Sequence, residues 1–159
     1  MNIAVSTISF GNVVFMKKNS IFTSIAQIVK RFPLTLCCIV LIWLLCFCTP
    51  PSTGLDQVIG IDKLAHIVMY LGTCGIFWAE FLRSKFFSRE IRTKNFYRKI
   101  AFFSFLAFTS MSAIIELLQE FATTHRGGEW MDLISNALGA ALASIFGAVV
   151  AIKKSSIKK

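Results

Sequence analysis

Charged side chains are scarce in this chain of 159 residues, and negative ones are the scarcest. Asp and Glu number 8 against 17 Lys and Arg, and charged residues make up 16% of the sequence. Hydrophobic residues make up 55%, and the mean hydropathy is +0.68. This composition is too apolar for a soluble domain of this size and is typical of a protein embedded in a membrane.

Zinc-finger and redox patterns are missing from the cysteines and histidines. None of the five cysteines forms a C-x-x-C pair, and no histidine lies at zinc-finger spacing from them. All five lie inside apolar segments, so we interpret them as small packing residues. The cysteines therefore assign no metal ion and no cofactor to the chain.

Four apolar segments follow one another along the chain, at residues 34–48, 63–82, 100–122 and 131–152. They predict an all-α integral membrane protein, a bundle of four transmembrane helices that occupies residues 33–153. The first segment is short, because fifteen residues of helix span only ~22 Å of a ~30 Å hydrocarbon core. Flanking polar residues can extend it. Small residues near helical spacing, Gly72 and Gly75 in the second segment and Gly139 and Gly147 in the fourth, predict faces for close helix packing.

The two ends of the chain lie outside the predicted bundle. Residues 20–32 place apolar side chains at helical spacing and predict an amphipathic helix on the membrane surface. We interpret residues 1–19 as a disordered tail or a mispredicted extension, since Met16 followed by two lysines resembles a natural start. Residues 154–159 form a basic tail.

The basic residues predict the orientation of the bundle. With four spans, all but two of the 17 Lys and Arg fall on one side, and only Lys63 and Arg126 fall on the other. The positive-inside rule then places both termini in the cytoplasm. Orientation accounts for the net charge of +9, so membrane lipids and not nucleic acids are the expected partners.

Polar residues interrupt the last three apolar segments near one end of each. Asp62, His66 and Tyr70 are four residues apart and share one face of a helix. Glu116 of the third segment and Asn136 of the fourth match the depth of His66, ~6–9 Å below the outer helix ends. Gln119 and Asp132 lie on the same two segments, closer to those ends. Charge is costly in lipid, so we expect these side chains to meet in one cluster, with Arg126 reaching over it.

The ordered set of motifs resembles the VanZ-like family of small bacterial membrane proteins. The motifs are D-K-x-x-H-x-x-x-Y from Asp62, E-x-x-Q from Glu116, Arg126, and D-x-x-x-N-x-x-G from Asp132. The resemblance covers about residues 61–147 and implies a multi-pass protein of the bacterial cytoplasmic membrane. The founding member of that family is associated with raised resistance to the glycopeptide antibiotic teicoplanin.

Three functions remain open from the residues. In the first, the pocket binds an anionic or lipid-linked envelope ligand, such as a cell-wall precursor or a lipid headgroup, between Lys63 and Arg126. The remaining ligand-binding candidates are Tyr70, Gln119, Asp132 and Asn136.

In the second function the protein is a hydrolase or transferase that acts on a lipid headgroup. His66 is the general base, oriented by Asp62, and Glu116 is an acid or metal ligand. His66, Glu116 and Asp132 could also bind a divalent cation. In the third, the polar cluster only fixes helix packing. The sequence does not decide whether the chain is an enzyme.

Overall fold

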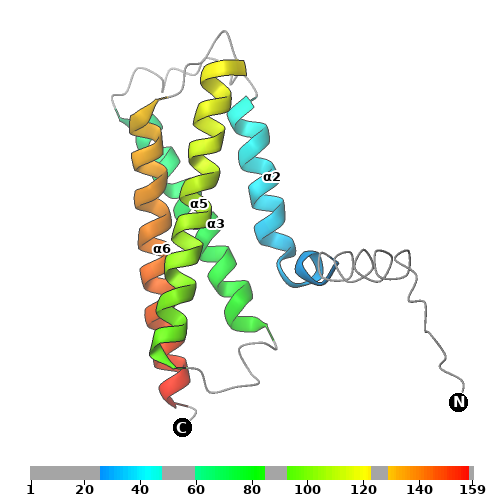
Figure 1. Ribbon diagram of the computed structural model, residues 1–159, viewed down its shortest axis with the longest axis vertical. Coiled ribbons are helices and arrows are strands. Elements are labelled where there is room, and N and C mark those ends of the chain that lie inside the picture. Colours follow the sequence, from blue (N-terminus) through cyan, green and yellow to red (C-terminus); the bar gives the residue numbers. More distant parts are fainter. Residues whose placement is uncertain (1–25, 48–59, 85–92, 123–128, 158–159) are drawn as a thin grey trace, which may run out of the picture.

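The computed structural model describes residues 26–47, 60–84, 93–122 and 129–157, and almost all of them are helical. Residues 26–31 form a short helical stretch, followed by α2 (Pro33–Phe47), α3 (Ile61–Arg83), α5 (Lys94–Ala122) and α6 (Trp130–Ile157) (Figure 1). The described residues contain no strand, so the all-α prediction is confirmed. The predictions for residues 1–19 and for the first part of the surface helix lie outside the described residues.

Three of these helices are long and apolar enough to cross a membrane: α3, α5 and α6. The chain is therefore a multi-pass membrane protein. α2 is apolar but has only 15 residues, which is shorter than a membrane span normally requires.

The long helices extend beyond the apolar segments that predicted them. α5 begins at Lys94, six residues before the predicted start, and α6 ends at Ile157, five residues after the predicted end. The predicted basic tail is thus largely the last turn of α6. Lys and Arg form helix readily and extend their charged ends into water, so a helix can continue past the apolar region.

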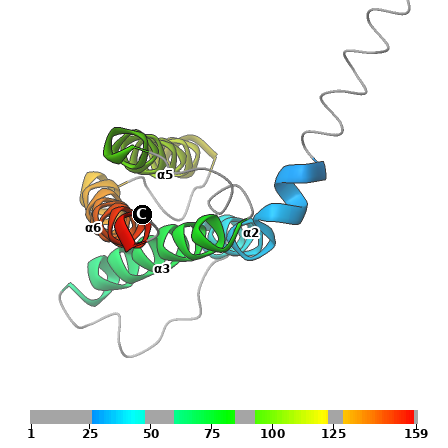
Figure 2. The ribbon, with the colours of Figure 1, turned by 90° about the horizontal axis from the view of Figure 1, so that it is seen from below.

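α6 is the central helix of the bundle. It packs against both α3 and α5, whereas α3 and α5 touch each other little and α2 packs mainly on α3 (Figure 2). The start of α3, the end of α5 and the start of α6 lie at the same end of the molecule (Figure 1). The predicted polar positions of all three helices therefore lie at one end.

Two glycines allow α6 to approach α3 closely. A Cβ added at Gly139 would overlap the carbonyl oxygen of Ile67 and lie 2.9 Å from the backbone nitrogen of Leu71. A Cβ added at Gly147 would overlap the ring of Trp78. Both glycines were predicted to form a small-residue seam on this helix, and that prediction is confirmed.

A second small-residue face, predicted on α3, has no such neighbour. No atom of the described residues lies within 4 Å of a Cβ built at Gly72 or Gly75. The prediction of close helix packing through these two glycines is therefore wrong for the described part of the chain. Small residues permit a close approach, but the rotation of each helix decides which small face is used.

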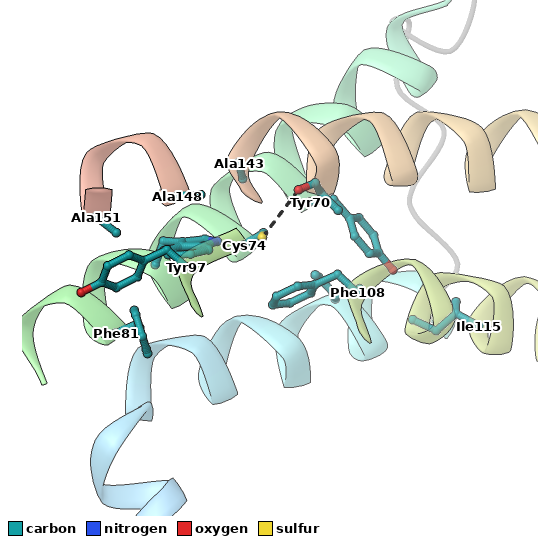
Figure 3. Close-up of a cluster of buried hydrophobic side chains, with 12 residues drawn as sticks. Tyr70, Cys74, Phe81, Tyr97, Phe108, Ile115, Ala143, Ala148 and Ala151 are labelled. Carbon is teal, nitrogen blue, oxygen red and sulfur yellow. Dashed lines mark hydrogen bonds between the residues drawn. The ribbon is translucent and has the colours of Figure 1, made fainter. Parts of the chain in front are cut away.

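The middle of the bundle is held by hydroxyl and thiol contacts on α6. Ser144 Oγ lies 3.0 Å from Ser104 Oγ of α5 and 3.4 Å from Cys74 Sγ of α3. Tyr70 extends from α3 towards α5, where it lies near Phe108 and Ile115 (Figure 3). Below the polar end, α6 thus contributes small side chains to the core, and the other helices contribute aromatic ones.

Both ends of α2 are anchored to neighbouring helices. At its start, Glu80 of α3 accepts the backbone N–H groups of Leu34 and Thr35 at 2.9 and 3.1 Å, and the Thr35 hydroxyl at 2.6 Å. At its end, Gln119 of α5 donates to the carbonyl of Cys46 at 2.7 Å. A carboxylate at a helix N-terminus satisfies unpaired donors and favours the helix dipole.

Glu80→Ala should weaken the docking of α2 by about 1–2 kcal/mol, the usual effect of losing a helix cap. We expect faster amide hydrogen exchange along α2 in detergent, with α6 unchanged. Thr35→Val is the matched control, because it removes the hydroxyl contact and keeps both backbone N–H groups. Equal exchange in Glu80→Ala and the wild type would show that the cap contributes nothing.

Candidate functional site

Three helices contribute to a buried chain of hydrogen bonds at the polar end. His66 Nδ1 of α3 lies 3.1 Å from Asn136 Oδ1 of α6, and Asn136 Nδ2 donates to Ser112 Oγ of α5 at 2.7 Å. Tyr70 lies one turn after His66 on the same face of α3. All four side chains are buried. The predicted meeting of His66 and Asn136 is confirmed, and their roles stay predictions.

These hydrogen bonds determine the tautomer of His66. Because Asn136 uses its amide nitrogen to donate to Ser112, its oxygen faces His66 and accepts from Nδ1. In the neutral imidazole the proton is therefore on Nδ1, and the Nε2 atom presents its lone pair.

The Nε2 atom of His66 faces two carboxylates. It lies 3.4 Å from Asp132 Oδ2 and 3.7 Å from Asp62 Oδ1, and the three possible ligand atoms all lie within 4.8 Å of one another. One imidazole nitrogen and two carboxylate oxygens at this spacing can hold a metal ion.

Lys63 holds the other oxygens of the same carboxylates. Its ammonium lies 3.2 Å from Asp62 Oδ2 and 2.6 Å from Glu129 Oε2, and it also pairs with Asp132 Oδ1. Each aspartate thus gives one oxygen to Lys63 and directs the other towards His66. The sequence predicts that Lys63 contacts an anionic ligand directly. In the structure its ammonium instead lies among three carboxylates.

Glu116 is connected to the cluster through the backbone of Glu129. Its Oε2 accepts the backbone N–H of Glu129 at 3.0 Å, next to the start of α6. The cation ligand set that the geometry supports is therefore Asp62, His66 and Asp132, and not the predicted set with Glu116. The role of Glu116 as a catalytic acid stays a prediction.

Two other predicted ligand-binding residues are Gln119 and Arg126. Gln119 is buried and donates to the end of α2, so this contact links α5 with α2. Arg126 lies outside the described residues. The roles proposed for both stay predictions.

Two residues of the cluster were not assigned a role from the sequence. Ser112 lies one turn before Glu116 on the same face of α5, and that spacing was the available signal. Glu129 lies three residues before Asp132, and its carbonyl accepts the Asp132 N–H at 3.0 Å, as a residue at the start of a helix does. An acidic residue at that position was the signal for Glu129.

A pocket of about 310 Å³ adjoins the cluster between the end of α5 and the start of α6. Its walls are mostly apolar, with three carboxylates among them, and it is lined by Ala113, Glu116, Leu117, Glu120, Glu129, Trp130 and Leu133. Glu129 belongs to both the pocket and the cluster, since it pairs with Lys63. A molecule in the pocket would therefore lie beside the carboxylates that surround His66.

The arrangement has the parts of a divalent cation site. It offers one imidazole nitrogen and two carboxylate oxygens. Asn136 and Lys63 orient these ligands by contacting the other ring nitrogen and the other carboxylate oxygens. Carboxylate and imidazole ligands together suit Mn²⁺ and Zn²⁺. The resemblance to a known family rests on the sequence motifs, since no family model, curated protein or solved structure matches the chain.

Proposed function

We propose that this chain is a VanZ-like protein of the bacterial cytoplasmic membrane that holds a divalent cation between Asp62, His66 and Asp132. Through the cation it binds the phosphate of a lipid headgroup or lipid-linked cell-wall precursor, a role that agrees with a link to glycopeptide resistance. One observation carries this proposal: one ligand atom each of Asp62, His66 and Asp132 lies within 4.8 Å of the other two.

A cation explains how a negative cluster can bind an anionic ligand. The described cluster and pocket contain five carboxylates and one lysine ammonium, and a divalent cation among them would attract phosphate. The carboxylates belong to Asp62, Glu116, Glu120, Glu129 and Asp132. Three protein ligands leave coordination positions for phosphate oxygens or water.

The proposed orientation places the cluster on the outer side of the membrane. The opposite end of the bundle carries the basic residues at the start of α5 and the end of α6 (Figure 1). They are Lys94, Arg98, Lys99, Lys153 and Lys154. The positive-inside rule supports a cytoplasmic location for that end. In this proposal α2 is a short fourth span, and residues 26–31 belong to a surface helix.

A second function, headgroup hydrolysis or group transfer, is favoured by the carboxylates beside the cluster. Glu116 and Glu129 line the adjoining pocket, where either can accept a proton from water next to a bound headgroup. A divalent cation would polarise the phosphoryl oxygen there. If neither binding nor turnover is found, the remaining function of the cluster is to fix helix packing.

The test is Mn²⁺ binding to the purified protein, measured from the loss of the free-ion signal in electron paramagnetic resonance. We expect the wild type to bind about one Mn²⁺ per chain, since one site is formed. His66→Ala and Asp132→Asn should lose saturable binding. Ser135→Ala is the control, because this buried α6 hydroxyl contacts only the Met131 carbonyl among the hydrogen bonds described.

Two outcomes would contradict the cation site: no binding by the wild type, or unchanged binding in both ligand variants. Incubation with envelope lipids, with and without chelator, then separates the two functions. Product that disappears in His66→Ala indicates an enzyme, and saturable lipid binding without product indicates a binding protein. Variants that change only the melting temperature indicate a structural role.

A further inference from the structure

A second site lies at the end of the bundle opposite the polar cluster, where residues 26–31, the start of α2 and the end of α3 meet. A pocket of about 780 Å³ occupies this junction. Three basic side chains line it, those of Lys30, Arg31 and Arg83, together with one carboxylate, that of Glu80. The basic residues come from two different helical segments, so the fold and not the local sequence brings them to one pocket.

An aromatic contact holds the two segments together at this junction. The ring of Phe32 stacks on the ring of Phe77 in α3, with centroids 5.3 Å apart. Pro33 has no backbone N–H to continue the hydrogen bonds of residues 26–31, and the chain bends there, away from the axis of α2 (Figure 1). The two basic residues directly before Phe32 are thereby kept beside the end of α3.

The carboxylate in the pocket is already engaged by the start of α2. Glu80 accepts the backbone N–H groups of Leu34 and Thr35 and the Thr35 hydroxyl. Lys30 and Arg83 are exposed, and within the described residues neither of them forms an ion pair with a carboxylate. Their positive charges are therefore available to an anion from outside the chain.

Exposed apolar side chains border the same pocket. Leu34 lines it and is 56% exposed, and Ile28 and Val29, in the same turn as Lys30, are 53% and 50% exposed. In a chain that crosses a membrane such side chains contact acyl chains, while basic residues beside them contact phosphates at the membrane surface. A phospholipid can make both kinds of contact, whereas a free phosphate can meet only the charges.

We infer that this pocket binds an anionic phospholipid through the phosphate of its headgroup. The planar guanidinium of Arg83 can contact two phosphate oxygens, and the Lys30 ammonium adds a point charge from the segment before α2. The orientation proposed above makes this a lipid of the cytoplasmic leaflet. The inference goes beyond the proposed function, because the site lies at the opposite end of the bundle and requires no metal ion.

Native mass spectrometry of the full chain, with metal removed by chelator, tests this binding. We expect the wild type to retain phosphatidylglycerol about tenfold better than phosphatidylcholine with identical acyl chains, as two exposed charge pairs allow. The double variant Lys30→Gln with Arg83→Gln should lower this ratio to about one and leave Mn²⁺ binding unchanged. Glycerol phosphate, a headgroup without acyl chains, should not be retained.

The matched control is Lys94→Gln with Lys154→Gln, which removes two exposed charges at the same end of the bundle but outside the pocket, and should keep the wild-type preference. Equal retention of the two lipids by the wild type overturns the inference. So does a preference that survives the pocket double variant, one that disappears equally in the control, or retention of glycerol phosphate as strong as that of the lipid. A wild type that prefers phosphatidylglycerol but binds no Mn²⁺ contradicts the proposed function and leaves this pocket standing.

Discussion

Gly139→Ala should force α3 and α6 apart and lower the free energy of unfolding by about 2–3 kcal/mol, in the range of overpacked cores. The added methyl group would overlap the backbone of Ile67 and press on that of Leu71, and backbone atoms cannot move aside as a flexible side chain can. The same displacement would separate His66 from Asp132, so cation binding should weaken as well.

The control for this variant is the same substitution on the facing helix. Gly72→Ala and Gly75→Ala meet no described atom within 4 Å, so they should change stability little or raise it by up to about 1 kcal/mol, since Ala favours helix over Gly. Reversible unfolding in mixed detergent measures all three. A Gly139→Ala protein as stable as Gly72→Ala would contradict the close packing of α3 on α6.

Asn136→Leu should weaken cation binding about 10- to 100-fold, the usual effect of losing a residue that orients a metal ligand. Asn136 touches no proposed cation; it accepts from His66 Nδ1 and donates to Ser112. Leucine has similar size but no polar group, so the imidazole loses the partner that sets its tautomer. Two buried polar groups are then left without this partner, at a cost of about 1–3 kcal/mol each.

A stability effect must be separated from a positioning effect in this variant. Ser144→Ala breaks a buried polar contact on the same helix, two turns further from the cluster, and should lower stability without changing Mn²⁺ affinity. Asn136→Asp keeps an oxygen for His66 and should restore part of the affinity. If both Asn136 variants bind Mn²⁺ as the wild type does, Asn136 does not position His66.

The presence of a polar cluster at one end was predictable because charge is costly in lipid. Asp62, His66 and Asn136 stand out in apolar segments, and helix direction places them at matching depth. The length of the apolar segments also predicted the three long helices. The sequence therefore carried both the membrane class and the level at which the polar residues meet.

The partners within the cluster were not predictable from the sequence. Lys63 pairs with Glu129 and Asp132, which lie 66 and 69 residues away in the chain. Whether a lysine meets a carboxylate or faces an open ligand site depends on the rotation of α3 against α6. That rotation is set by Gly139, whose contact with the α3 backbone no local pattern specifies.

The helix ends were also poorly predicted, for a related reason. Hydropathy marks where lipid contact ends, and Lys94, Arg98 and Lys153 all lie beyond that point while still in helix. Among the small residues, Gly72 and Gly139 have the same local signature. Only Gly139 faces a neighbouring helix within the described structure.

The central place of α6 affects the order in which the protein is assembled during translation. α6 is made after α3 and α5, and those two helices touch each other little without it. Until α6 inserts, His66, Lys63 and Ser112 lack the partners that Asn136, Asp132 and Glu129 supply. The polar site is therefore the last part to form, and a nascent chain stopped before α6 would expose these side chains to membrane quality control.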